Sequence, residues 1–182
     1  MFKVVRRICH LRSMLTIQSA TPAETDIVID ILVDAVRWLE SRGLPTWSPD
    51  GLADTMPNAV RRGEVYLARI DERPVGTVSI QWADPVYWGQ RPDNAGYIHK
   101  LAIMRAAAGQ QIGAQLLAWS EQMIVARDLP FARLDCHAAN PFINHFYQAA
   151  GYKSRGTVVT NNRLLNLYEK AVLAVNRQDD SR

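Results

Sequence analysis

A strand–helix–strand unit between residues 96 and 137 constrains the fold of this chain more than any other feature. Residues 96–104 and 131–137 are rich in β-forming side chains, and residues 108–127 place apolar side chains at helical spacing. Two strands joined by a helical crossover must pair in parallel. The rest of the sheet has to be built around this parallel pair.

The flanking segments predict five more strands and three more helices. Short polar turns between neighbouring β-rich segments indicate hairpins, which require antiparallel pairing. Pro57 is expected to bend or break the second helix, and residues 83–95, with two prolines and a glycine, are expected to form a loop. The additional strands are expected at residues 15–20, 64–70, 74–82, 153–160 and 163–172, and the additional helices at 21–43, 48–62 and 140–150. This order predicts an α/β (α+β) fold with a central mixed sheet of about seven strands flanked by about four helices.

Composition and charge favour one ordinary globular domain. Of the 182 residues, 21 are basic and 18 acidic, but four of the basic residues lie among the first thirteen, which leaves 17 basic against 18 acidic elsewhere. A near-neutral body offers no field suited to nucleic acid, and the absence of an apolar run of roughly 20 residues argues against a membrane span. We expect a domain over residues 14–172, an upstream extension (disordered or non-native, with a targeting peptide as the rival interpretation) at 1–13, and a frayed tail at 173–182.

Cysteine and histidine usage predicts a reducing, cytoplasmic setting without a metal. The two cysteines are Cys9 and Cys136, which do not form a disulfide framework. Cys136 and His137 are adjacent in a strand and face opposite sides, so they make a poor metal pair. His145 is isolated, and no CxxC or HExxH motif occurs.

The turn at residues 105–114 offers a phosphate site. A glycine-containing turn that enters a helix presents unpaired backbone N–H groups and the positive end of the helix dipole. The sequence RAAAGQQIGA is neither GxGxxG nor a P-loop. Taken alone, this turn is equally consistent with small residues that allow a helix and a strand to pack closely.

The run YIHKLAIMRAAAGQQIGAQLLAWSEQMI, followed by ARLDCHAANPFINHFYQAAGY, resembles the GNAT acetyltransferase superfamily. The resemblance extends in element order over residues 15–170 and is strongest over 97–152. It implies that acetyl-CoA is the cosubstrate, that the turn holds the CoA diphosphate through backbone amides, and that backbone groups of two strand residues pair with pantetheine and polarise the thioester. The positions implied for CoA are Leu101, Ile103, Gly109, Gln110, Gln111, Ile112, Gly113 and Ala114.

The turn departs from the family pattern Q/R-x-x-G-x-G/A at two positions. Ala108 replaces the usual Gln or Arg, and Gln111 replaces the first glycine. A helical conformation at Gln111 would let its side chain point outward, whereas a positive φ would favour the missing glycine.

The resemblance also assigns Asn140 and Tyr147. Asn140 matches a residue near the pantetheine amides, and it is also suited to cap a helix before Pro141. Tyr147 matches the family's general acid, and its alternative role is that of a core aromatic. A phenol of pKa near 10 is a reasonable donor to a thiolate leaving group.

The general base stays open among three candidates. Many family members have a Glu at the position of Tyr97, where this chain has no carboxylate. His99 lies two residues on, on the same face of the strand, and imidazole titrates in a suitable range. A structural role for His99 and an ordered water acting on a backbone carbonyl are the alternatives.

The acceptor pocket is expected to draw on aromatic and acidic side chains that stack on, or pair with, a cationic amine. These candidates are Trp47, Trp82, Asp84, Trp88 and Tyr97.

The sequence thus predicts an N-acetyltransferase that moves an acetyl group from acetyl-CoA to a primary amine, carried by a small molecule or a peptide, by direct attack in a ternary complex. No nucleic acid, membrane or metal partner is expected, and a homodimer is left open. The alternatives are a non-catalytic acyl-CoA-binding or sensing module of the same fold, and a nucleic-acid-associated protein that uses its basic first thirteen residues.

Overall fold

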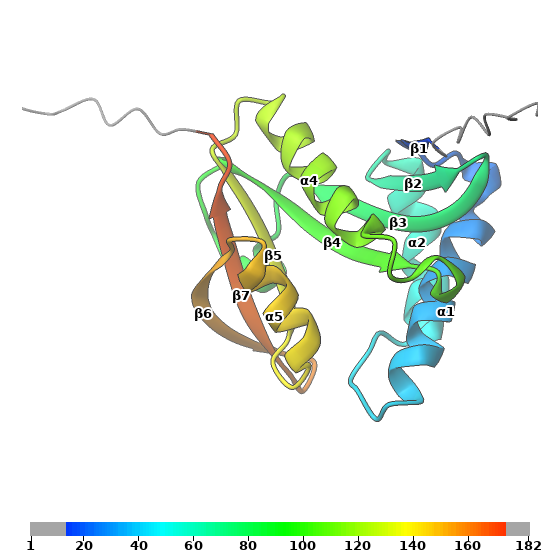
Figure 1. Ribbon diagram of the computed structural model, residues 1–182. Coiled ribbons are helices and arrows are strands. Elements are labelled where there is room, and N and C mark those ends of the chain that lie inside the picture. Colours follow the sequence, from blue (N-terminus) through cyan, green and yellow to red (C-terminus); the bar gives the residue numbers. More distant parts are fainter. Residues whose placement is uncertain (1–13, 174–182) are drawn as a thin grey trace, which may run out of the picture.

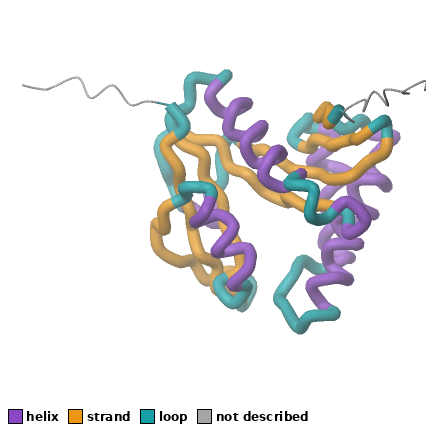
Figure 2. The backbone as a smooth tube through the Cα atoms, in the orientation of Figure 1, coloured by secondary structure: helices purple, strands orange, loops and turns teal. Residues whose placement is uncertain are grey.

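The computed structural model describes residues 14–173 and places the predicted parallel pair inside one seven-stranded sheet. The strand order is β1-β2-β3-β4-β5-β7-β6, and every neighbouring pair is antiparallel except β4 and β5. The sheet and its helices are drawn in Figure 1, and the same path is coloured by secondary structure in Figure 2. The predictions for residues 1–13 and 174–182 lie outside the described residues. The predicted mixed α/β architecture is confirmed.

The elements follow the predicted order closely. The strands are β1 (Leu15–Ser19), β2 (Val65–Ile70), β3 (Arg73–Gln81), β4 (Ala95–Ile103), β5 (Phe131–His137), β6 (Lys153–Thr160) and β7 (Arg163–Ala171). The helices are α1 (Thr25–Glu40), α2 (Pro49–Arg61), α3 (Pro85–Trp88), α4 (Ile112–Val125) and α5 (Pro141–Ala149), with 3-10 turns at Pro22–Glu24 and Arg105–Ala107. Within the described range, none of these helices has the length and apolar character needed to cross a membrane.

Three local predictions were wrong. The 83–95 segment contains the one-turn helix α3, because Asp84 Oδ1 accepts a hydrogen bond from the Tyr87 amide at 3.4 Å and Pro85 occupies the first turn. Helix α2 continues through Pro57, held by an apolar face that is buried against α1. Helix α4 begins at Ile112 rather than at 108, because the preceding residues form a 3-10 turn and Gln111 is left-handed.

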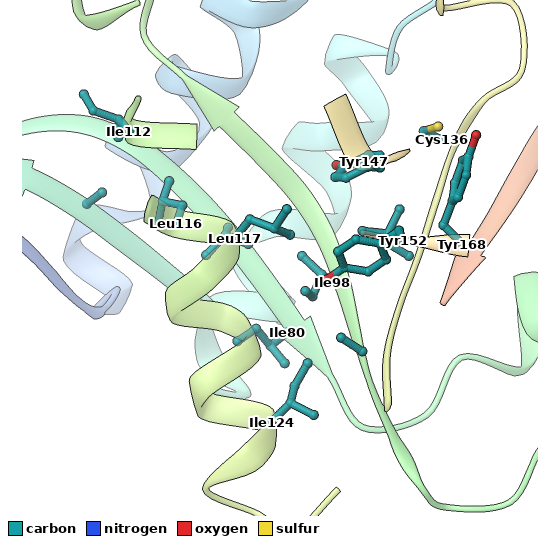
Figure 3. Close-up of a cluster of buried hydrophobic side chains, with 14 of the residues drawn as sticks. Ile80, Ile98, Ile112, Leu116, Leu117, Ile124, Cys136, Tyr147, Tyr152 and Tyr168 are labelled. Carbon is teal, nitrogen blue, oxygen red and sulfur yellow. The ribbon is translucent and has the colours of Figure 1, made fainter. Parts of the chain in front are cut away.

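Two main apolar cores hold the layers together. Helices α1 and α2 pack on one face of the sheet and bury Ile31, Leu32 and Leu52 there. Helix α4 covers the other face with Leu116 and Ile124, which lie over Ile80 of β3 and Ile98 of β4 in Figure 3. The sheet is therefore buried on both sides in its N-terminal half, and β4 is fixed from above and below.

The parallel pair is joined for only part of its length. Residues 95–98 of β4 pair with residues 131–134 of β5, and no pairing between the two strands continues past Ile98 and Leu134. At that point β4 bulges, since Lys100 and Leu101 stand opposite Val78 alone and Lys100 has φ of 51°. Strand β5 instead stays paired with β7 along its whole length. The two strands diverge, as Figure 1 shows, and the opening between them positions the candidate site.

Candidate active site

A cavity of about 650 Å³ lies where β4 and β5 separate. Its walls come from residues 98–103 of β4, residues 135–137 of β5, one side of α5, the turn between β6 and β7, and, opposite these, α1, α2 and the loop between them, with a smaller part from β3. Polar backbone that a continuous sheet would have paired is left open along β4. Such an edge can hydrogen-bond an extended ligand.

The start of α4 meets this cavity at Gly113. The Gln115 amide donates to the Gln111 carbonyl at 3.1 Å and so begins the helical hydrogen-bond ladder, which leaves the amides of residues 112–114 without intrahelical acceptors. These donors and the helix dipole suit a phosphate group.

Gln111 adopts the left-handed conformation, with φ of 57° and ψ of 18°. The helical alternative considered from the sequence is therefore excluded, and the position is one that favours glycine. The side chain of Gln111 is exposed. A residue other than glycine is strained in this conformation.

Asn140 both caps α5 and lines the cavity. Its Oδ1 accepts a hydrogen bond from the Ile143 amide at 3.2 Å, which is the predicted helix cap, and the residue is buried and lines the cavity. The capping role is thereby confirmed.

Tyr147 reaches the cavity from α5 and is otherwise enclosed by aromatic rings. Its ring centroid lies 5.3 Å from Phe146, 5.9 Å from Tyr152 and 6.3 Å from Tyr168; the three tyrosines are labelled in Figure 3. Burial, which removes water from the phenol, raises the pKa of Tyr147, and the nearby Asp135 carboxylate adds to this effect. The hydroxyl is therefore protonated at neutral pH and is available as a proton donor.

Cys136 also lines the cavity, but as an unreactive thiol. Its Sγ donates to Asn144 Oδ1 at 3.4 Å, and burial, with Asp135 next, raises its pKa to about 12. Because the thiolate is the nucleophilic form, this residue is poorly suited to covalent catalysis.

His99 lies between two carboxylates. Its Nε2 is 3.3 Å from Asp84 Oδ2, and its Nδ1 is 3.5 Å from Asp135 Oδ1. All three side chains are largely buried, and burial raises the pKa of the Asp135 carboxyl against the lowering influence of His99. A positive charge gained by the imidazole would be flanked by acid on both sides.

Strand register explains why these side chains meet. Tyr97 of β4 is the direct partner of Arg133 in β5. Two residues further along each strand, on the same face, stand His99 and Asp135, the first such pair beyond the point of divergence. The face carries α3, which supplies Asp84 from its cap position.

This cluster also contains the ligand types of a divalent cation. One donor atom from each of Asp84, His99 and Asp135 lies within 4.8 Å of the others. Each imidazole nitrogen, however, faces a different carboxylate, and one ion cannot be ligated by both nitrogens. The predicted absence of a metal stays a prediction.

Comparison with known proteins decides the family. The Acetyltransferase (GNAT) family profile matches residues 32–152, which is more than half of the chain. The chain belongs to the GNAT acetyltransferase family. The predicted superfamily and the acyltransferase class are thereby confirmed.

Individual relatives agree with this GNAT assignment. The uncharacterized N-acetyltransferase YesJ of Bacillus subtilis (strain 168) is 29% identical over 162 residues, which cover 83% of this chain and 87% of the relative. A GNAT-family acetyltransferase from Listeria monocytogenes 4b F2365 is 26% identical with a TM-score of 0.72, over 86% of this chain and 94% of that one. The PaiA N-acetyltransferase of Thermoplasma acidophilum, solved with coenzyme A, is 15% identical with a TM-score of 0.67, over 87% and 99% of the two chains.

The residues predicted to contact CoA either line the cavity of this GNAT fold, are buried in the core, or are exposed near the start of α4. Those that line the cavity are Leu101, Ile103, Gly113 and Asn140. Ile112 is buried in the core beneath α4, and the four exposed around the start of that helix are Gly109, Gln110, Gln111 and Ala114.

Three of the proposed acceptor residues lie elsewhere. Trp82 packs against the α4 core with the Arg127 guanidinium 3.9 Å above its ring. Trp88 and Tyr97 form an edge-to-face pair, 6.0 Å between centroids, around the buried Arg133. Their aromatic surface is used for packing, and none of the three lines the cavity. The prediction that they form part of the acceptor pocket was therefore wrong.

The other two acceptor candidates do lie at the site. Trp47 lines the cavity from the loop between α1 and α2. Asp84 is buried behind His99 and contacts its Nε2.

Among the charged side chains of this GNAT cavity that were not proposed from the sequence are Lys100, Asp135 and Arg163. Asp135 carried a usable signal, since it is an acid inside the otherwise apolar strand ARLDCH and follows the parallel-paired part of β5. Lys100 depends on a bulge, and Arg163 depends on where a hairpin turn falls, so neither was visible from local pattern.

Proposed function

We propose that this protein transfers the acetyl group of acetyl-CoA directly to a primary amine of a small molecule or a peptide. The single observation that carries the proposal is the cavity at the divergence of β4 and β5, because it combines an open strand edge, the amino end of α4, Tyr147 and His99. Acetyl-CoA supplies an activated acyl group when bound. The remaining chemistry is positioning and proton transfer by this chain's own residues.

The residues present fit a CoA thioester. Backbone amides of residues 112–114 would hold the diphosphate, and Leu101 and Ile103 on the unpaired part of β4 would bond the pantetheine arm through their backbone. Asn140 stands on the opposite wall, on α5. The left-handed Gln111 counts against easy binding, but its side chain is exposed and does not line the cavity, so it does not fill the space in front of the amides.

Proton transfer is assigned to His99 and Tyr147. Only the neutral amine attacks a thioester, and an alkyl amine of pKa about 10.4 is neutral in only about one molecule in 2,500 at pH 7. His99 accepts the proton of the amine, and its resulting charge lies between Asp84 and Asp135. Tyr147 donates a proton to the departing thiolate, since the phenol is protonated at neutral pH, although burial makes it a weaker acid than a free phenol.

Direct transfer is favoured over an acyl-enzyme. Cys136 is the thiol that lines the cavity within residues 14–173, and a pKa of about 12 leaves almost none of it as thiolate at neutral pH. A ternary complex therefore suits the site better than a two-step exchange.

The test is CoA-thiol release from acetyl-CoA across a panel of amines, with Tyr147→Phe beside the wild type. We expect kcat to fall by about 10²–10⁴-fold with the acetyl-CoA Kd unchanged. Tyr152→Phe is the matched control, because Tyr152 belongs to the same aromatic cluster but does not line the cavity. Equal turnover in Tyr147→Phe and wild type would remove Tyr147 from the mechanism, and binding without release for every amine would favour the non-catalytic acyl-CoA module instead.

A further inference from the structure

Near His99 and Asp135, two cationic side chains line the cavity without an ionic partner among the described residues. Lys100 on β4 and Arg163 at the start of β7 form no salt bridge and no side-chain hydrogen bond within residues 14–173. Of the other arginines on the cavity wall, Arg62 pairs with Glu64 at 2.6 Å, whereas Arg105, beyond the end of β4, has no salt bridge in the described part of the chain and stacks on Trp38 at 4.3 Å. An uncompensated cation is costly when it is withdrawn from water.

Lys100 lies next to the acid–imidazole cluster. It occupies the β4 bulge with φ of 51°, directly after His99, and its Nζ lies 5.0 Å from the centroid of the Trp47 ring. Burial lowers the pKa of the Lys100 ammonium, and Arg163 lowers it further, against the raising effect of Asp135. The two cations are therefore close enough to repel each other.

Arg163 faces the same space. Its charge also acts on two groups that line the cavity: burial raises the pKa of Tyr87 against the opposing effect of Arg163, and burial lowers the pKa of His137 with Arg163 adding to that effect. Asp135, the acid that acts on Lys100, lies 3.5 Å from His99 Nδ1 and forms no salt bridge with either cation. One wall of the cavity thus carries the acid–imidazole cluster, and beside it stand two cations that lack an anion.

We infer that Lys100 and Arg163 bind an anionic group, a carboxylate or a phosphate, on the acceptor itself. The amine of that acceptor is then directed to His99 and its flanking carboxylates, so the preferred substrate is a zwitterionic amine of the amino-acid or phospho-amine class rather than a simple alkylamine. This inference rests on the proposed acetyl transfer. Charge-assisted bonds from Lys and Arg to such oxygens are the strong ones in proteins, and Arg offers a bidentate fork.

The test compares matched acceptors that differ only in the anion. One arm pairs amino acids with their carboxamides, the second pairs phosphoethanolamine with ethanolamine, and a third contains plain alkylamines. We expect one anionic arm to exceed its neutral partners by at least about 10-fold in kcat/KM, and the arm that does so identifies carboxylate or phosphate. In Lys100→Met and Arg163→Gln this preference falls by about 10–100-fold through acceptor KM, while the acetyl-CoA KM is unchanged.

The controls carry the same substitutions on exposed positions: Lys153→Met and Arg73→Gln are expected to behave as wild type. Neutral and anionic acceptors used equally well would overturn the inference and leave the acetyl transfer standing. A rise in the KM for acetyl-CoA, rather than for the acceptor, would also overturn it, because the cations would then serve the cosubstrate. If no amine of any arm is acetylated, the proposed function itself fails.

Discussion

Replacing Arg133 by methionine tests how the fold holds the two strands together just before they diverge. Arg133 is 5% exposed; its Nε donates to Glu169 Oε2 at 2.8 Å, and its Nη1 donates to the Tyr97 hydroxyl at 2.9 Å. It therefore joins β4, β5 and β7 at the pair of residues directly before His99 and Asp135. Methionine keeps most of the length of the side chain and removes the charge.

The expected loss is about 3 kcal/mol in the free energy of unfolding. A hydrogen bond to a charged group contributes about 1.5–3 kcal/mol and the neutral bond to tyrosine about 1, while an unpaired buried acid raises the cost toward the 3–5 kcal/mol seen for broken buried pairs. Arg155 reduces the penalty, because its half-exposed guanidinium remains 2.8 Å from Glu169 Oε1. Packing of the methionine against Trp88 offsets a little more.

Urea unfolding of Arg133→Met and of Arg133→Met/Glu169→Leu measures this directly. The double variant is expected to recover most of the stability, because it leaves no charge buried without a partner. A single-variant loss below about 1 kcal/mol, or a double variant no more stable than the single one, would refute the reasoning.

Three further outcomes follow from the site. Cys136→Ala keeps kcat within a few-fold of wild type, because a thiol of pKa about 12 is neutral at pH 7 and does not attack the thioester. For the same reason, mass spectrometry of wild type mixed with acetyl-CoA finds no acetylated Cys136. An acetyl-cysteine peptide would contradict direct transfer. Asp135→Asn raises the free energy of unfolding by about 1 kcal/mol at pH 7 but not near pH 3. Burial raises the pKa of Asp135, so the wild-type carboxyl loses its favoured neutral form as the pH rises through that pKa, whereas asparagine stays neutral. Melting temperatures of the two proteins that differ by the same amount at both pH values would count against this. Gln111→Gly raises stability by about 0.5 kcal/mol without weakening acetyl-CoA binding, because relief of the left-handed strain exceeds the added chain entropy; a destabilised variant would contradict it.

The order of elements was predictable because it depends on local pattern and on the one crossover that forces a parallel pair. β5 and β6 have the predicted bounds, and the Asn140 cap lies where the residue types place it. The errors occur where tertiary packing overrides a local preference. Pro57 stays inside α2 because the apolar face of that helix is buried, and a capped proline turn forms α3 in a segment expected to be loop.

The site was less predictable, because it depends on which strand face each side chain occupies and where pairing ends. Tyr97 and His99 share a face as expected. The Tyr97 hydroxyl, however, accepts a hydrogen bond from the buried Arg133, whereas His99 lies just beyond the divergence and lines the cavity. Asp135 becomes its neighbour only through the register of β4 against β5, which the sequence does not specify. Lys100 enters the cavity through a bulge that adds one residue to β4.

The most direct test of the account is a calorimetric titration of acetyl-CoA beside acetyl-pantetheine, which lacks the diphosphate and nucleotide. If the amides at the start of α4 hold the diphosphate while the open edge of β4 holds the thioester arm, acetyl-CoA binds with one saturable site and at least about 10-fold more tightly than the fragment. No measurable binding of acetyl-CoA, or equal binding of the two, would contradict the account.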